Sequence, residues 1–277
     1  MKKKKSIIIL VSSLLIISLV SYIAFAAGDN QDKKTPLDYG LFASENIEMG
    51  GSGGDIKADI WANNFLGFYG VGFVVRGDTW SSNNIREAGS YTDSSNAVWQ
   101  NSGLNIGDKA HIITARKDMI QMMDNIKEMV KSENNYSEVT GDLDFSKLSP
   151  SEIALGKDYI ASGNITVSMT NSNTNKNLNS YLIAEGNINI DLNNFIGKED
   201  NKQDISNIRP VMIASNKDII IRGNPVIVGT IYAPNGTVKI EGSGTYLIGN
   251  IIAKNIRVSG AGLFMNDESK IAIKEDL

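Results

Sequence analysis

The feature that most constrains the fold is a repeat of about 20 residues near the C-terminus. Each copy places a short apolar segment that ends in alanine before a second apolar segment and a glycine. Three copies are centred on Ala214, Ala233 and Ala253, which lie 19 and then 20 residues apart. A fixed period of this length, with short apolar segments and glycine turns, is typical of a β-solenoid. The repeat therefore predicts stacked coils that share one interior.

Within one copy, apolar residues alternate with residues that we expect to face outwards. Such alternation over a few residues indicates a short strand with one buried face. Three inward pairs and three turns would make a roughly triangular coil. In the second copy the pairs are Ile231 with Ala233, Val238 with Ile240, and Tyr246 with Ile248.

The alanine segments and closing glycines also define the wider extent of the repeat. We expect the alanine to fit a tight inner corner, and Gly229, Gly242 and Gly249 to take bends that need a positive φ or a close approach. The alternative is a β-sandwich whose strands happen to recur. The structural repeat residues are Ala43, Ala62, Ala161, Ala184, Ala214, Ala233 and Ala253, with Gly223, Gly242 and Gly260.

The period changes to that of a helix in Thr114–Lys131. Its apolar face consists of Met119, Met123, Ile126 and Val130. We expect this helix to pack on the side of the solenoid or to cap its end; the alternative is a methionine-rich helix that binds a partner. A second, short helix should begin at Ser149-Pro150-Ser151-Glu152, which has the residues of a capping box, and end near Gly156.

The N-terminus reads as a targeting segment. Lys2–Lys5 precede an apolar run from Ile7 to about Ala27, and Ala24-Phe25-Ala26 matches a cleavage pattern of small residues. We expect export with cleavage near Ala26 or Ala27. The alternative is a retained membrane anchor, because the run is close to the length that spans a bilayer. In either case this segment contacts the membrane.

These features give a fold class and a domain organisation. The sequence predicts an all-β protein, a single-stranded β-helix of about 20 residues per coil, with one packing or capping α-helix and an N-terminal hydrophobic helix. Residues 1–27 are the signal peptide or membrane anchor, 28–38 a linker, and 39–277 the solenoid domain, with an insertion of loop and helix at about 76–156. Ile271-Ala-Ile273 should add a last strand that blunts the open edge.

Composition excludes several classes of function. The formal net charge is −4, which disfavours nucleic acid as a partner. The chain has one histidine and no cysteine, so neither a histidine pair nor a thiolate site for zinc is available. We expect no cofactor and no metal.

A search for catalytic chemistry gives few candidates. Asp142 and Asp144 have the spacing to touch a calcium ion, but we interpret them as solvated loop acids. His111 is interpreted as a structural residue, and Arg222 with Glu241 as an ion pair between adjacent coils. A carbohydrate-active β-helix would use an aromatic and acidic surface, for which the candidates are Trp61, Trp80, Trp99 and the loops near Asp142.

Two segments carry a resemblance to a known family. Gly229-Thr-Ile-Tyr-Ala-Pro-Asn-Gly-Thr-Val-Lys-Ile-Glu-Gly242 and Gly249-Asn-Ile-Ile-Ala-Lys-Asn-Ile-Arg-Val-Ser-Gly260 resemble the C-terminal β-helix of bacterial surface proteins of the pilus-assembly (PilX-type) family. The resemblance implies an envelope protein with an N-terminal membrane segment and a β-helix outside. A weaker likeness is to bactofilin-like polymer-forming proteins.

We therefore expect a non-enzymatic, exported β-solenoid at the cell surface that acts as a structural or adhesive module in a pilus-like surface assembly. Its partners would be other envelope proteins or surface glycans. One alternative is a β-helix that binds or cleaves carbohydrate, and another is a self-polymerising scaffold of the bactofilin type.

Overall fold

The fold is described from a computed structural model of the whole chain. It describes residues 35–69, 73–82, 84–87, 110–112, 122–154, 156–168, 180–192, 195–196, 210–242, 244–260 and 262–266. The chain divides after Thr35 into two units, and the second unit, Pro36–Leu277, contains the fold. The predicted leader, Met119, Trp99 and Ile271–Ile273 lie outside the described residues. Within the described part of the chain, no helix is long and apolar enough to cross a membrane.

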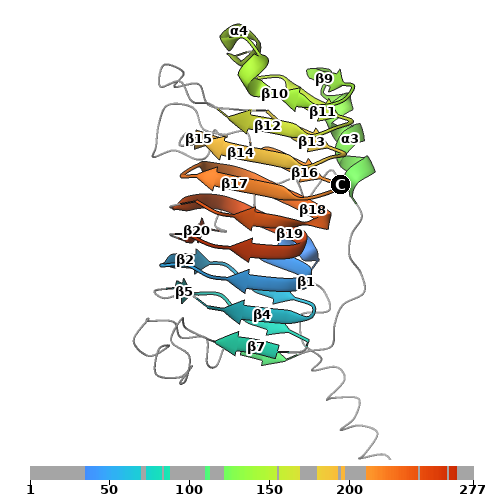
Figure 1. Cartoon of the computed structure of the whole chain (residues 1–277). Helices are drawn as coiled ribbons and strands as arrows, with labels where there is room; N and C mark the ends of the chain where they lie inside the picture. The colour runs from blue at the N-terminus through green and yellow to red at the C-terminus, as the bar shows by residue number, and fades with distance from the viewer. Residues whose placement is uncertain are drawn as a thin grey trace, which may run out of the picture. The chain divides into compact units, whose positions relative to one another are not determined.

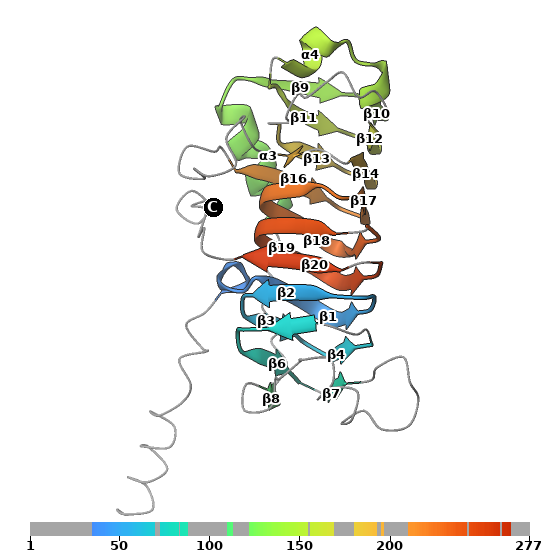
Figure 2. The same cartoon turned by 90° about the vertical axis from the view of Figure 1, so that its left-hand side faces the viewer.

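The second unit is a β-solenoid, as the repeat predicts. Each coil contributes up to three short strands, and equivalent strands of successive coils pair in parallel to form ladders A, B and C (Figures 1 and 2). Two neighbouring parallel strands must be joined by a crossover connection, and here the rest of the coil provides that connection.

Ladder A consists, in spatial order, of β9 (Tyr136–Val139), β11 (Asp158–Ala161), β13 (Leu182–Ala184), β16 (Val211–Ser215), the middle of β18 (Val226–Ile240), the middle of β19 (Thr245–Val258), the start of β1 (Leu41–Met49), β3 (Ile60–Ala62), β6 (Thr79–Ser81) and β8 (Ala110–Ile112).

Ladder B consists of β10 (Leu143–Asp144), β12 (Ile165–Ser168), β14 (Ile188–Leu192), β17 (Ile219–Gly223), the ends of β18, β19 and β1, β4 (Phe65–Phe68) and β7 (Asn84–Glu87). Ladder C consists of β15 (Phe195–Ile196), the starts of β18 and β19, β20 (Leu263–Asn266), β2 (Gly54–Lys57) and β5 (Phe73–Val75).

The coils do not stack in sequence order. The chain enters the stack at β1 and winds to β8, and it then re-enters at the far end with β9 and winds back until β19 and β20 meet β1 and β2. Figure 1 shows this directly, because the blue and cyan strands lie next to the red ones while the green strands lie at the opposite end. We call β1 to β8 the N-terminal block and β9 to β20 the main block. The predicted open edge of the last coil is therefore paired with the first coil.

The interior is lined by one column of small residues and by branched apolar side chains. Ala161 pairs with Ala184, and Ala233 and Ala43 both pair with Ala253. Ala62 continues the column next to Ala43.

One coil departs from the predicted alignment of alanines. Ala214 lies opposite Ile183 and Tyr232, and it is Ser215 that pairs with Ala184. Serine is as small as alanine, and the Ser215 hydroxyl donates to the carbonyl of Gly186 at 2.6 Å in the preceding coil. The column therefore selects small size rather than alanine.

The third strand of the repeat also differs from the prediction by one residue. Thr245 and Leu247 are fully buried, whereas Tyr246 is 38% exposed. Its neighbour Ile248 is buried, as expected. The aromatic ring misled the sequence reasoning because a tyrosine between apolar residues normally indicates a core position.

A column of glycines stacks where ladder B leads to ladder C. A Cβ built on Gly242 would lie 2.0 Å from the Gly223 carbonyl oxygen, and one on Gly260 would lie 2.2 Å from the Gly242 oxygen. Gly51 continues the column, at 2.1 Å from the oxygen of Gly260. These predicted glycines are therefore required by the close approach of adjacent coils.

Among the described residues, four short helices accompany the coils: η2 (Pro36–Asp38), α3 (Met123–Ser132), η4 (Phe145–Lys147) and α4 (Pro150–Ala154). The capping box of α4 is confirmed, because the Ser149 N–H donates to Glu152 at 2.7 Å and the Glu152 N–H donates to the Ser149 hydroxyl at 3.3 Å. The range predicted as an insertion, about 76–156, also supplies β6 to β10, since its polar residues obscure short strands.

The glycine column yields a test of coil stacking. Gly260 and Gly141 have nearly the same φ, +89° and +90°, but only Gly260 faces the neighbouring backbone, since nothing lies within 4 Å of a Cβ on Gly141. Both alanine substitutions pay the left-handed penalty of about 1–2 kcal/mol. We expect Gly260→Ala to lose about 1–3 kcal/mol more, because the coils must separate locally. Urea unfolding followed by circular dichroism measures this, and equal losses would contradict the stacking.

Candidate functional site

The corner between ladders A and B carries a line of polar side chains, which we call the corner ladder. Each member stands where ladder B begins, either directly before the strand or as the first residue that pairs in ladder B. In spatial order its members are Asp142, Asn164, Asn187, Asp218, Thr237, Asn255, Asn46 and Asn64.

From β10 to β18, the corner ladder ties each coil to the next through hydrogen bonds. The backbone N–H of Asn164 donates to Asp142 Oδ1 at 2.7 Å, and that of Asn187 donates to Asn164 Oδ1 at 2.8 Å. The Asp218 N–H donates to Asn187 Oδ1 at 3.1 Å, and the Thr237 N–H to Asp218 Oδ1 at 2.9 Å. A backbone donor at a bend has no partner in its own ladder, so a stacked side-chain acceptor satisfies it.

The sequence reasoning missed this ladder. In most of these coils an asparagine or aspartate follows the small residue by two or three positions, as Asn164 follows Ala161 and Asn64 follows Ala62, whereas Thr237 follows Ala233 by four. That recurrence was the available signal. It was hidden because asparagine is also the ordinary residue of turns.

Charged side chains on the outer surface also join adjacent coils. Arg222 Nη2 lies 2.9 Å from Glu241 Oε2, which confirms the predicted pair. Lys239 Nζ lies 2.7 Å from Asp218 Oδ2. Burial raises the pKa of Asp218, but hydrogen bonds from the Lys239 ammonium and the Thr237 N–H hold it below its ordinary value. These charges therefore act between coils.

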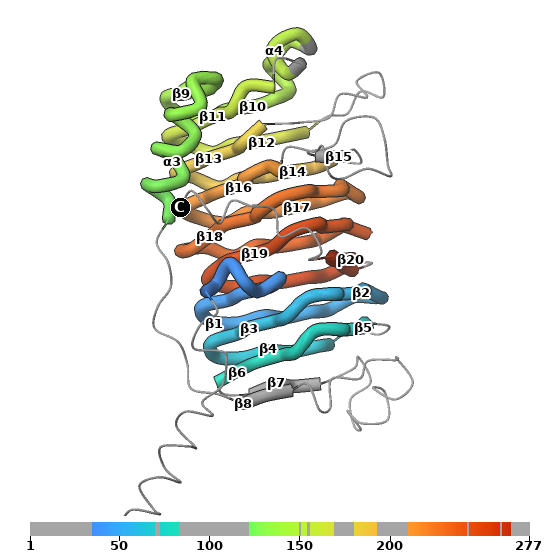
Figure 3. Tube along the Cα trace, turned by 180° about the vertical axis from the view of Figure 1, so that it is seen from behind, coloured from blue at the N-terminus to red at the C-terminus, as the bar shows by residue number. Residues whose placement is uncertain are grey.

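Helix α3 lies along ladder A from β18 to β9 (Figure 3). Its buried residues Met123, Ile126 and Val130 belong to the same apolar core as the coils, so the predicted helical face is confirmed in the described residues. At its start, the Met122 N–H donates to the Tyr232 hydroxyl at 2.8 Å. Burial raises the pKa of Tyr232, which keeps this hydroxyl neutral.

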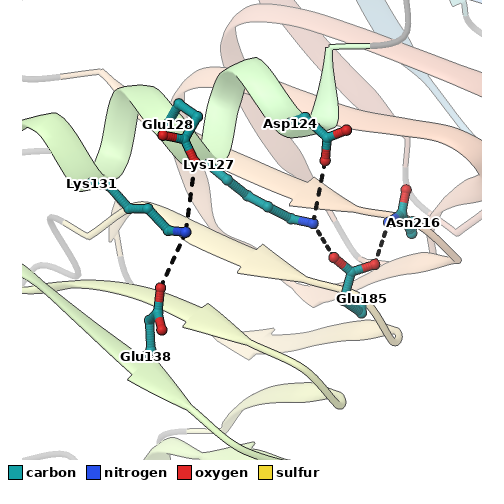
Figure 4. Close-up of polar contacts among 7 residues, drawn as sticks. All are labelled: Asp124, Lys127, Glu128, Lys131, Glu138, Glu185 and Asn216. Carbon is teal, nitrogen blue, oxygen red and sulfur yellow. Dashed lines mark hydrogen bonds and ion pairs between the residues drawn. The ribbon is translucent and has the colours of Figure 1, made fainter.

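Lysines on the exposed side of α3 reach the coil corners (Figure 4). Lys127 forms an ion pair with Glu185, which follows β13, and Glu185 also accepts a hydrogen bond from Asn216. One turn later, Lys131 Nζ lies 3.3 Å from Glu138 Oε1 on β9. The Lys127 ammonium, together with Asn216, lowers the pKa of Glu185 despite partial burial. Helix α3 thus clamps several coils of the main block.

The predicted carbohydrate surface is not formed as expected. Trp61 and Trp80 are only 3% and 4% exposed, and the ring centroid of Tyr39 lies 5.3 and 5.6 Å from theirs. These tryptophans belong to β3 and β6 in the N-terminal block, whereas Asp142 precedes β10 at the other end of the stack. The structure therefore does not bring the predicted aromatic and acidic residues together.

The predicted acids have partners within the coils. Asp142 belongs to the corner ladder, and Asp144 accepts hydrogen bonds from the backbone and hydroxyl of Ser146, which lower its pKa. The backbone of His111 lies in β8. Among the described residues, no group of three or more histidine, aspartate or glutamate side chains could hold a metal ion.

Comparison with known families gives one match. A family model described as "Domain of unknown function (DUF7305)" matches residues 134–272, half of the chain. The match includes the strands β9 to β20, the whole of the main block, and leaves out α3 and the N-terminal block. No curated protein and no solved structure matches the chain.

The clamp by α3 makes stability depend on pH. Because Lys127 lowers the pKa of Glu185 in the folded chain, this pair stabilises the fold above the ordinary glutamate pKa of 4.5 and loses its effect as the pH falls through the lowered value. Glu185→Gln should therefore cost up to about 1 kcal/mol at pH 7, since the pair is partly exposed. The cost should vanish in strong acid.

The urea midpoints of the natural chain and of the Glu185→Gln variant, at neutral and at acidic pH, measure this dependence. The matched background is Lys127→Met, in which the effect of Glu185→Gln should vary less with pH, because only the hydrogen bond from Asn216 then lowers the pKa of Glu185. A cost that is the same at both pH values, or a pH dependence that is undiminished without Lys127, would refute the clamp.

Proposed function

This chain belongs to the DUF7305 family, whose description names no activity, and we propose that it is an exported, non-enzymatic β-solenoid of the cell envelope that serves as a structural or adhesive module. The observation that carries the proposal is the continuity of the three ladders through both blocks. A stack of parallel coils with a shared interior forms an elongated and regular surface, which suits a spacer or a display platform.

The charged side chains on the outer surface form ion pairs between coils, which supports a structural role. The ion pairs Arg222–Glu241, Lys239–Asp218 and Arg76–Asp55 each join one coil to the next. The corner ladder does the same with amide and carboxylate oxygens. These polar groups of the described surface therefore strengthen the stack, as the groups of a structural module do.

The predicted N-terminal leader and the resemblance to the pilus-assembly family support the proposed location in the cell envelope. Lys2–Lys5 and the apolar run after them have the pattern of an export signal. An exported chain without cysteine depends on its core rather than on disulfides, and stacked coils provide that core. The resemblance to the pilus-assembly family favours a pilus-like surface assembly as the setting.

A second candidate is the binding of surface glycans. Tyr246 and Phe264 are 38% and 39% exposed and lie opposite each other on adjacent coils of ladder C. Asp55 continues this row, and its carboxylate binds the guanidinium of Arg76 at 2.8 and 2.9 Å. Exposed aromatic rings beside charged groups favour a ligand with both apolar faces and hydroxyl groups.

Export is tested by comparing the full chain with a chain that lacks residues 1–27, both carrying the same C-terminal reporter. We expect the full chain to be cleaved by protease added to intact cells. The truncated chain should stay protected inside. A full chain that remains inside the cell would overturn the proposed location.

Glycan binding is tested on a glycan array, with a reducing-sugar assay on every polysaccharide that binds. The double variant Tyr246→Ala/Phe264→Ala should lose binding by at least about tenfold, since two stacking rings contribute more than about 1.4 kcal/mol. Lys239→Ala on ladder B is the matched control and should bind normally. Turnover of any polysaccharide would show that the protein is an enzyme, and unchanged binding by the double variant would exclude these rings.

A further inference from the structure

The contact between the last coil and the first coil joins segments that are far apart in the sequence. We call it the seam: β19 pairs with β1 from Leu41↔Ile251 to Met49↔Val258, and β20 pairs with β2 from Asp55↔Phe264 to Lys57↔Asn266. In the rest of the main block, a coil pairs with the coil that follows it in the chain. At the seam, no short connection links the two coils.

The seam nevertheless repeats the stacking seen within each block. Ala253 meets Ala43 in the small-residue column, and Asn255 Oδ1 accepts from the N–H and Nδ2 of Asn46 at 3.2 and 3.0 Å. The glycine column also continues through it, as Gly51 approaches Gly260. A coil end of this protein therefore recognises another coil end by backbone pairing, shape and corner hydrogen bonds.

The charges at the seam give the contact a direction. The N-terminal block presents Glu45 and Glu48, and the main block presents Lys254 and Arg257. Lys254 Nζ lies 3.5 Å from Glu45 Oε1, and Arg257 Nε lies 3.0 Å from Glu48 Oε2. Two surfaces of the same kind would bring like charges together, which is unfavourable. The seam therefore selects one N-terminal block with one main block.

We propose that a second copy of this chain can form the seam, with the N-terminal block of one copy stacked on β19 and β20 of another. Every copy carries both complementary surfaces, so exchange of the block needs no new contact. The contact is heterologous, and its repetition places copies head to tail in a line. Within one chain, the two surfaces of the seam are present at a high effective concentration, which favours their contact with each other. Exchange between copies therefore increases with protein concentration.

This inference rests on the proposed structural role and names the partner that the role requires. It also differs from the addition of a coil at a free end of the stack. At the β9 end, η4 and α4 follow β10 directly, and Phe145 and Ile153 pack against the core. The β9 end is therefore covered, and the surfaces that we propose for exchange are those of the seam.

The test uses two full-length single variants, Glu48→Cys and Arg257→Cys. These positions lie opposite each other across the seam, and the natural chain has no cysteine. One variant carries a tag that changes its size. The variants are mixed at high concentration, incubated in mild denaturant, returned to buffer and oxidised. A disulfide between one tagged and one untagged chain then reports a seam between copies, because adjacent strands place the Cα atoms within disulfide range.

Lys239→Cys replaces Arg257→Cys in the matched control. Lys239 lies opposite Arg257 in the same outward row but one coil away from the seam. We expect several-fold more mixed dimer from the 48 and 257 pair than from the 48 and 239 pair, with a yield that rises with concentration.

A third chain carries Glu48→Cys and Arg257→Cys together and should close a disulfide within itself, which verifies the seam geometry. The proposed exchange between copies would be overturned if this chain closes its internal disulfide while the mixed dimer of the single variants is no more abundant than in the control. Failure to close would overturn it as well, because the seam would not exist. Neither outcome alters the protease and glycan measurements, which test the proposed function separately.

Discussion

Parallel backbone pairing between coils is the interaction on which the rest of this structure depends. Adjacent strands lie about 4.8 Å apart, and this spacing fixes what every corner can hold. It brings Gly260 against Gly242, it keeps small residues in the inner column from β11 to β6, and it places Asn164 Oδ1 next to the backbone N–H of Asn187 in the following coil. The outer ion pairs and α3 add to a stack that the backbone has already set.

The same pairing explains how the chain can stack its coils out of sequence order. A coil end offers unpaired N–H and carbonyl groups, and any coil with the matching twist and small corner residues can satisfy them. In this chain the first coil satisfies the last one, which covers an edge that would otherwise be open. The family match covers the main block alone, so the N-terminal block adds coils to the family's domain at one end.

The periodic features of the fold could be predicted from the sequence. Alternating pairs such as Val238 and Ile240 indicate the strands, and Gly242 and Gly260 indicate the corners, because these signals are local. The order of the coils could not be predicted, since Gly40–Asn64 resembles the later coils equally well whichever neighbour it has. The inward position of Leu247 was missed because its neighbour Tyr246 is the larger apolar residue.

The candidate site was less predictable. Arg222 and Glu241 could be paired from the repeat alone, because their positions in adjacent coils match. The corner ladder was harder to recognise, because the spacing between the small residue and the ladder residue varies from coil to coil and because Ser215 replaces alanine. Trp61 and Trp80 resembled an exposed binding surface, but Tyr39 covers them. Burial by a distant segment depends on tertiary structure, which composition and spacing do not encode.

The most direct test of the account is a distance between probes attached at positions 48 and 222, by spin-label or fluorescence methods. Cysteines introduced there are the only attachment sites, because the natural chain has none. With β1 stacked on β19, the two positions are separated by three coil steps, and the account predicts about 15 Å between backbones. A sequential stack, with β8 of the N-terminal block next to β9, would separate them by seven steps, or about 34 Å. That longer distance would contradict the arrangement described.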